Sequence, residues 1–220
     1  MPDLPRSPGI LDADDPDRGH GEFYESVGVG PHPQPWPTGE HFDVELLAAG
    51  DKRNVVDKYR YWSVNAIRDD LDRTRSRLHV AIENWQHDLN IGAIVRTANA
   101  FNVAAVHIVG RKRWNRRGAM VTDKYMHINH HPDVPDFAAW AAAAQTPIIG
   151  VENVQPATQL HVTKFPNMCV LFFGNESTGL SDEAIAACAS LVQIEQHGST
   201  RSMNASAAAA IAMWAWMIQQ

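Results

Sequence analysis

The sequence has only two cysteines, Cys169 and Cys188, among its 220 residues. Both lie in or beside apolar runs, and neither belongs to a CxxC pair. Disulfide scaffolds and cysteine-based metal or redox sites need more cysteines at closer spacing, so the pattern argues against them. We expect buried thiols, a reducing compartment and a cytoplasmic location.

A long hydrophobic segment is also missing. The most apolar stretch, residues 207–218, is shorter than the roughly 20 residues that cross a bilayer. A buried or interface helix explains it better. The N-terminal residues are rich in Asp and lack the apolar run of a secretory signal. Neither a membrane partner nor secretion is therefore predicted.

Positive charge is scarce overall but unevenly distributed. Residues 52–124 hold 15 of the 19 Lys and Arg but only 7 of the 25 Asp and Glu, a net charge of +8 in a chain of net charge −6. Such a segment is typical of a surface for a polyanion. Around residues 70–77, where Arg and Asp alternate, a solvated helix face explains the charges equally well. The five basic residues around Trp114 have no acid among them and favour RNA: Arg111, Lys112, Arg113, Arg116 and Arg117.

Three regions follow one another along the chain. Residues 1–40 hold eight of the thirteen prolines and predict a flexible, partly disordered segment. Residues 41–77 predict a helical extension, with apolar residues near helical spacing. From residue 78 to 220, strand-like and helix-like runs alternate, which predicts an α/β fold with a parallel sheet flanked by helices. Strands are predicted at 78–82, 104–109, 147–151, 168–173 and 191–194, and helices at 89–101, 136–144, 181–188 and 202–218.

The first polar motif is Asn90-Ile-Gly-Ala-Ile-Val-Arg96-Thr-Ala98, at the start of a predicted helix. Asn90 could simply cap the helix, and Arg96 could be a solvated residue opposite the apolar stripe. Neither explanation accounts for Gly92 in the first turn, where glycine weakens a helix. We expect a backbone or a ligand to approach closely at that position.

The second motif is Gly174-Asn-Glu176-Ser-Thr-Gly-Leu180-Ser181. It resembles a phosphate-binding loop only superficially, because Leu180 stands where such a loop needs Lys. The plain explanation is a turn followed by a helix that Ser181 caps. However, Glu176 follows a strongly apolar strand, and a carboxylate at the mouth of a central strand usually has a partner or a function.

The third motif, Ser202-Met203-Asn204-Ala-Ser206, opens the last predicted helix. Ser202 could cap that helix, and the free amides of a helix N-terminus can also bind a ligand. His127, His130 and His131 have no acid beside them, so we predict an exposed polar turn and no metal site.

Taken in order, these three motifs resemble those of the SpoU (TrmH-type) branch of the SPOUT RNA methyltransferases, over roughly residues 78–220. The family has N-x-G-x-x-x-R-T-A, G-N-E-x-x-G-L-S and S-L-N-x-S-x-A segments. The resemblance implies a C-terminal trefoil knot, a homodimer, and S-adenosyl-L-methionine as cofactor. It also implies methylation of a ribose 2′-oxygen in RNA, with tRNA favoured over ribosomal RNA.

The resemblance also assigns site residues. The cofactor contacts carry over to Gly174, Ile194 and Met203, and less directly to the loop around Glu152. Two positions depart from the family pattern: Glu195 stands where Pro is usual, and Met203 stands where Leu is usual. Leu to Met keeps an apolar contact, whereas Glu195 adds a charge to a cofactor loop.

Arg96 is the central catalytic residue that the resemblance implies. Because a guanidinium scarcely deprotonates in proteins, we expect Arg96 to clamp a phosphate and stabilise the developing alkoxide. Asn90, Glu176, Ser202 and Asn204 are expected to orient the arginine, the ribose and the cofactor. Arg96 and Glu176 should therefore converge beside one pocket. Two alternatives stay open, a knotted RNA-binding protein without catalysis and an enzyme that methylates a base.

Overall fold

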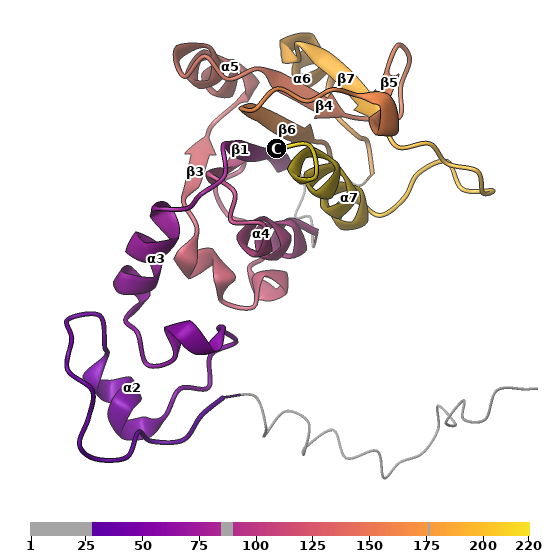
Figure 1. The fold of residues 1–220 in the computed structure, drawn as a ribbon. Coiled ribbons are helices and arrows are strands. Elements are labelled where there is room, and N and C mark those ends of the chain that lie inside the picture. The colour runs from indigo at the N-terminus through magenta and orange to yellow at the C-terminus, as the bar shows by residue number, and fades with distance from the viewer. Residues whose placement is uncertain (1–27, 85–89, 176) are drawn as a thin grey trace, which may run out of the picture. The chain divides into compact units, whose positions relative to one another are not determined.

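The computed structural model of this protein describes residues 28–84, 90–175 and 177–220. The chain divides into two compact units, Met1–Trp62 and Ser63–Gln220 (Figure 1). The helical extension predicted at residues 41–77 spans this division. Its last helix, α3 (Val64–Asp72), belongs to the larger unit.

The described part of the N-terminal unit contains α2 (Val44–Ala49) and the 3-10 helix η1 (Asp57–Tyr59). It is organised around Asp51, which is fully buried. The Arg53 guanidinium donates to both carboxylate oxygens of Asp51, at 2.8 and 2.7 Å, and the Tyr61 amide adds a third bond at 3.0 Å. Burial raises the pKa of Asp51, but these bonds outweigh it and lower the pKa to about 2.

The larger unit is built on a seven-stranded sheet in the order β3-β2-β1-β6-β4-β7-β5, and every pairing is parallel. Its strands are β1 (Leu78–Asn84), β2 (Ala105–Gly110), β3 (Ile128–His131), β4 (Ile148–Val151), β5 (Thr158–Gln159), β6 (Cys169–Phe173) and β7 (Ser190–Gln193). The α/β fold with a parallel sheet, predicted from the alternating pattern, is confirmed.

Helices cover both faces of this sheet (Figure 1). They are α4 (Asn90–Ala100), α5 (Val134–Ala143), α6 (Asp182–Ala187) and α7 (Ala205–Met217). Alternate strand residues separate into two cores: Val80 and Leu171 pack with α4 and α7, whereas Ala81 and Phe172 pack with α5 and α6. Burial on both faces explains why the strands read as nearly continuous apolar runs.

Three local predictions differ from the structure. Strands β3 and β5 were not predicted, because β3 is polar and β5 has only two residues. Helix α7 begins at Ala205, and Asn204 caps it, so the interpretation of Ser202 as its cap is wrong. Ser181 does cap α6, through a bond from the Ala184 amide.

Both cysteines are free thiols, as the sequence predicts. Cys169 is fully buried on β6 and Cys188 is partly buried after α6. Burial raises the pKa of each thiol to about 12, so neither thiol is activated as a nucleophile. Among the described residues, none of the helices has the length and apolar character needed to cross a membrane.

Candidate active site

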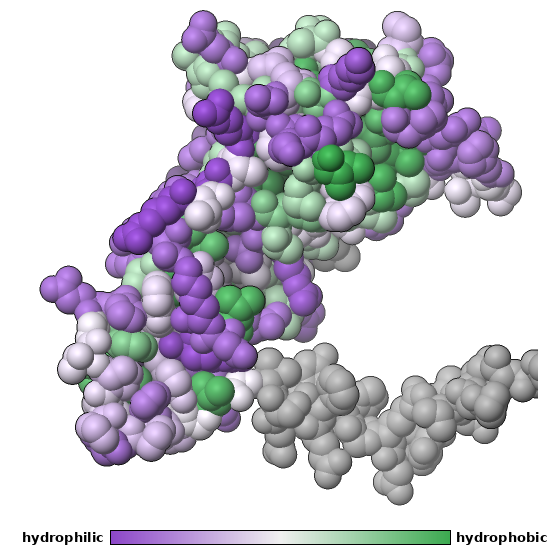
Figure 2. All heavy atoms as spheres, in the orientation of Figure 1, coloured by the Kyte–Doolittle hydropathy of each residue, from purple (hydrophilic) through white to green (hydrophobic). Residues whose placement is uncertain are grey.

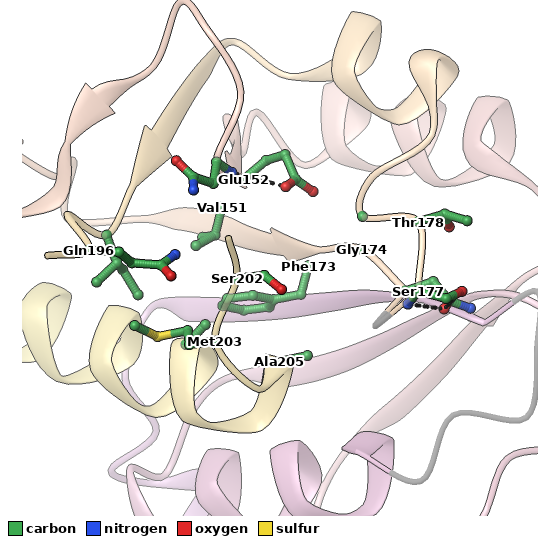
Figure 3. Close-up of a pocket in the computed structure, with 15 residues that line it drawn as sticks. Val151, Glu152, Phe173, Gly174, Ser177, Thr178, Gln196, Ser202, Met203 and Ala205 are labelled. Carbon is green, nitrogen blue, oxygen red and sulfur yellow. Dashed lines mark hydrogen bonds between the residues drawn. The ribbon is translucent and has the colours of Figure 1, made fainter. Parts of the chain in front are cut away.

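A pocket of about 240 Å³ opens at the carboxyl ends of β4, β6 and β7 (Figure 3). This is the edge of a parallel α/β sheet at which ligands commonly bind. Glu152 and Gly174 reach it from the ends of β4 and β6, and Ser202 and Met203 from the segment before α7. Gly174, Ile194 and Met203, predicted from separate motifs, all line this one pocket.

The second motif forms the pocket wall as a tight loop. Asn175 and Gly179 exchange backbone hydrogen bonds at 3.0 and 2.8 Å, which brings the two ends of the loop together. A Cβ at Gly174 would lie 2.0 Å from the carbonyl carbon of Gly179. Gly174 is therefore required because the chain crosses itself there, a reason that a sequence pattern does not reveal.

Two carboxylates hold this loop from neighbouring strands. Glu152 Oε2 accepts from the Leu180 amide at 2.7 Å. Glu83, fully buried at the end of β1, accepts from the Ser181 amide at 2.7 Å and from its hydroxyl at 2.8 Å. Sequence reasoning missed Glu83, although it follows an apolar strand in the same way that Glu176 does.

The first and third motifs meet beside the pocket. Asn204 Nδ2 donates to Asn90 Oδ1 at 2.9 Å, across 114 positions of the chain. Asn204 Oδ1 also accepts from the amides of Ser206 and Ala207 and so caps α7. Asn90 is the first residue of α4 and is buried, so its side chain joins the two helices.

Arg96 is exposed on α4, opposite the buried Ile94 and Ala98. Its guanidinium is therefore accessible to a ligand. Glu176 lies outside the described residues, so its predicted convergence with Arg96 stays a prediction. Ser202 lies in the pocket wall, on the segment that leads into α7.

The basic segment is held against α4 by two glycines. A Cβ at Gly92 would lie 2.8 Å from the Ala119 amide nitrogen, and one at Gly118 would lie 2.9 Å from the Ala93 amide nitrogen. The close approach predicted at Gly92 is therefore made by backbone, from the 3-10 helix η2 (Arg117–Ala119). The five basic residues are exposed on this segment: Arg111, Lys112, Arg113, Arg116 and Arg117.

Two further contacts fix the start of the basic segment. Buried Asn84, at the end of β1, donates to the backbone carbonyls of Arg111 and Arg113, the latter at 2.9 Å. Trp114 packs partly against the core, and the Arg116 guanidinium lies 5.5 Å from its ring centroid. The exposed charges thus stand on a fixed backbone.

The histidines predicted to form an exposed turn do not do so. His130 and His131 belong to β3, and His131 is buried. His131 Nδ1 lies 2.8 Å from Asp136 Oδ2, and its Nε2 lies 2.9 Å from His107 Nδ1. His107 Nε2 in turn lies 3.0 Å from His79 Nδ1. Three strands are thereby joined by a chain of imidazoles.

The direction of this histidine chain follows from Asp136. The carboxylate can only accept, so His131 donates from Nδ1, and Nε2 is the acceptor in the tautomer that this bond selects. The same argument places protons on Nδ1 of His107 and of His79. Burial, followed by the neighbouring imidazoles, lowers the pKa of His107 to about 3, which keeps it neutral.

Among the described residues, the structure brings no three His, Cys, Asp or Glu side chains together in a way that could hold a metal ion.

Comparison with solved structures shows which fold the chain has. The chain shares its fold with the Aquifex aeolicus TrmH/SpoU tRNA modifying enzyme, with a TM-score of 0.63 and 22% identity over 71% of this chain and 81% of that one. A similar match joins it to an AdoMet-bound rRNA methyltransferase from Sinorhizobium meliloti, with a TM-score of 0.60 and 23% identity over 69% of this chain and 59% of that one. Both of these solved structures are of RNA-modifying enzymes, and this chain shares their fold.

Sequence comparison defines the family. Residues 77–214 match the SpoU rRNA Methylase family, and the chain belongs to it. The family consists of RNA ribose-2′-O-methyltransferases that use S-adenosyl-L-methionine.

Two curated relatives are named tRNA (guanosine(18)-2′-O)-methyltransferase. The one from Thermus thermophilus is 26% identical over 67% of this chain and 78% of its own length. The one from Escherichia coli is 26% identical over 66% of this chain and 64% of its own length.

Proposed function

We propose that this protein transfers a methyl group from S-adenosyl-L-methionine to a ribose 2′-oxygen of tRNA. The observation that carries the proposal is the hydrogen bond between Asn204 and Asn90. It joins the first and third motifs at the rim of a pocket whose wall is the second motif. Ser202 and Met203, the two residues that precede Asn204, line that pocket.

The pocket is lined by both polar and apolar residues, which suits a cofactor with polar and apolar parts. Asn175 is buried in the wall, and its Nδ2 has no hydrogen-bond partner within the described part of the chain. An unsatisfied buried amide is costly, so it marks a place for a ligand acceptor. Ile194 and Met203 supply apolar surface beside it, and Gly174 lets a ligand approach the backbone.

When bound, S-adenosyl-L-methionine supplies a sulfonium methyl group that an oxygen can take up while the electrons of the C–S bond return to sulfur. Arg96 would hold an RNA phosphate and stabilise the negative charge that develops on the 2′-oxygen as its proton leaves to solvent. Asn90, Ser202 and Asn204 would keep the arginine and the ribose aligned with the pocket. Glu176 retains its proposed orienting role.

The exposed basic segment would bind the RNA backbone. Its five charges lie on the element that packs against α4, the helix that carries Arg96. Phosphate contacts position a nucleic acid without reading its sequence, so they are compatible with tRNA or ribosomal RNA. The curated relatives named above favour tRNA.

A homodimer is the proposed assembly. Helix α7 exposes Ile211, Trp214 and Ile218 at helical spacing, and the Trp214 ring lies 6.4 Å from Phe101 after α4. Figure 2 shows hydrophobic side chains gathered at the surface where α7 lies. A contiguous exposed apolar face of this kind marks a protein interface. The trefoil knot, the cytoplasmic location and the division into segments 1–40, 41–77 and 78–220 remain predictions.

Two alternatives are the same reaction on ribosomal RNA and a non-catalytic RNA-binding protein, and one experiment separates them from the proposal. Ribose methylation is mapped by mass spectrometry in total RNA from a strain without this protein and from the same strain complemented with it. The proposal expects loss of one 2′-O-methyl nucleotide in tRNA. Loss from ribosomal RNA would identify the other substrate. An unchanged ribose map would favour a non-catalytic RNA-binding protein or an enzyme that methylates a base, and loss of a methylated base from the same RNA would identify the latter.

A further inference from the structure

The loop that forms the pocket wall follows strand β6, and it is hydrogen-bonded to carboxylates from the strands on both sides of β6. Strand β6 lies between β1 and β4, and the loop of residues 174–181 follows it. Glu83 is the next-to-last residue of β1 on one side of β6, and Glu152 directly follows β4 on the other side. The two acids bind consecutive amides, those of Ser181 and Leu180.

Glu83 is more deeply buried than Glu152. Its side chain is fully buried, and a buried carboxylate is tolerated only where it accepts strong hydrogen bonds. Its Oε2 accepts from the Ser181 amide at 2.7 Å and its Oε1 from the Ser181 hydroxyl at 2.8 Å. That hydroxyl also accepts from the Ala184 amide at 3.1 Å, so Glu83 fixes the start of α6 together with the end of the loop.

Glu152 binds the same loop from the other side of β6. It lines the pocket, and its Oε2 accepts from the Leu180 amide at 2.7 Å. The fit leaves no space for a side chain at Gly179, where a Cβ would lie 2.3 Å from Oε2. The adjacent amides of Leu180 and Ser181 are thus bonded to carboxylates from two different strands.

We propose that Glu83 is a positioning residue for the methyl-donor pocket, which acts through Ser181 to hold the loop of residues 174–181 in its binding shape. This inference rests on the proposed function, because it takes the pocket to be the site of S-adenosyl-L-methionine. Glu83 is bonded to the outer end of the loop, and the described residues of the loop that line the pocket are Gly174, Asn175 and Ser177 to Gly179. Loss of its carboxylate therefore weakens donor binding and leaves the transfer step nearly unchanged once donor is saturating.

The test compares two substitutions at Glu83 with a matched control. Glu83→Ala removes both acceptors. Glu83→Gln keeps the shape and a neutral acceptor, which is roughly half as strong. Glu183→Gln removes an equal charge from an exposed position in the first turn of α6. Binding of S-adenosyl-L-methionine and of S-adenosyl-L-homocysteine is measured by calorimetry on the full-length protein, without RNA.

Hydrogen bonds to charged groups contribute about 1.5–3 kcal/mol, so Glu83→Ala should raise the Kd of both ligands roughly 10- to 100-fold. Glu83→Gln should raise the Kd by a few-fold, and Glu183→Gln should leave it within about twofold of wild type. In methyl transfer, Glu83→Gln should raise the KM for the donor while kcat stays within about threefold of wild type.

Two results would overturn the proposal. A folded Glu83→Ala protein that binds both ligands as wild type does would overturn the proposal. So would a Glu83→Gln protein with unchanged KM and a large loss of kcat. If Glu83→Ala does not fold, the Glu83→Gln measurements decide. Failure of the proposed function is distinguishable, because wild-type protein would then bind neither ligand.

Discussion

Asn90 and Asn204, 114 positions apart, share a hydrogen bond of 2.9 Å that ties the start of α4 to the cap of α7. The bond links the start of α4, the helix that carries the proposed catalytic residue Arg96, to the segment that lines the pocket. Two substitutions at Asn204 separate this role from helix capping. Asn204→Ala removes both, whereas Asn204→Ser keeps a capping oxygen but is too short to reach Asn90.

We expect Asn204→Ala, which loses both the cap and the bond to Asn90, to lower the free energy of unfolding by about 2 kcal/mol, and Asn204→Ser, which loses only the bond, to lower it by about 1 kcal/mol. Both should lower kcat/KM roughly tenfold, the equivalent of one lost hydrogen bond. Urea unfolding and methyl-transfer kinetics measure the two effects. An Asn204→Ser enzyme with wild-type kcat/KM would show that the bond to Asn90 has no catalytic role.

Gly92 tests the attachment of the basic segment to α4. In Gly92→Ala the new methyl group would lie 2.8 Å from the Ala119 nitrogen and 2.9 Å from the Asn115 oxygen, which are backbone atoms that cannot rotate away. We expect a loss of about 1–3 kcal/mol in unfolding free energy, as for other overpacked sites. Because η2 must shift, RNA affinity in a filter-binding assay should fall as well.

Gly198→Ala is the control for this substitution, because a Cβ there has no atom within 4 Å. It should leave unfolding free energy and RNA affinity near their wild-type values. If Gly92→Ala matched this control in both measurements, the close backbone contact would not be a constraint on the fold.

His107 should make stability depend on pH. Its pKa falls from 6.5 to about 3 in the folded protein, so the unfolded chain binds the additional proton between those values. The stability that neutral His107 contributes is therefore complete above about pH 6.5 and is lost as the pH falls toward 3. The pKa of His79 is also lowered by burial and acts in the same direction.

The measurement is urea unfolding between pH 7.5 and 4.5 for wild type and His107→Phe. The variant loses two hydrogen bonds and should be less stable at pH 7.5, but its stability should fall less steeply toward pH 4.5. Asp51, with a pKa of about 2, titrates below this range. Parallel slopes for the two proteins would contradict the assigned burial of His107.

Trp214 tests the proposed dimer. Its side chain is 53% exposed on α7, between Ile211 and Ile218 on the same face. A charge at the centre of an apolar interface strongly opposes association, so Trp214→Glu should shift the protein from dimer to monomer in light scattering. Val56→Glu, at a residue 64% exposed in the N-terminal unit, should not. A wild-type protein that is already monomeric would refute the dimer.

Much of the site was predictable because its residues lie in local motifs. Gly174, Ile194 and Met203 were assigned from three separate segments, and the parallel sheet brings all three to one pocket. A polar residue that directly follows an apolar run marks the end of a strand, so the positions of these residues could be predicted from the sequence.

What could not be predicted depends on partners from other strands. Glu83 binds Ser181 across 98 positions, and His107 meets His79 and His131 only because β1, β2 and β3 lie side by side. The sequence of β3 alone does not indicate which residues of β2 it lies beside. The constraint on Gly92 likewise comes from the backbone of residues 115–119, far along the chain.

The central claim is tested most directly by purified protein, tritiated S-adenosyl-L-methionine and unmodified tRNA, followed by alkaline digestion. A 2′-O-methyl group blocks cleavage at its nucleotide, so wild-type protein should place the label in alkali-resistant dinucleotides. Arg96→Ala should bind the methyl donor normally and transfer no label. Label in mononucleotides, or full transfer by Arg96→Ala, would contradict the proposed reaction or the role of its arginine.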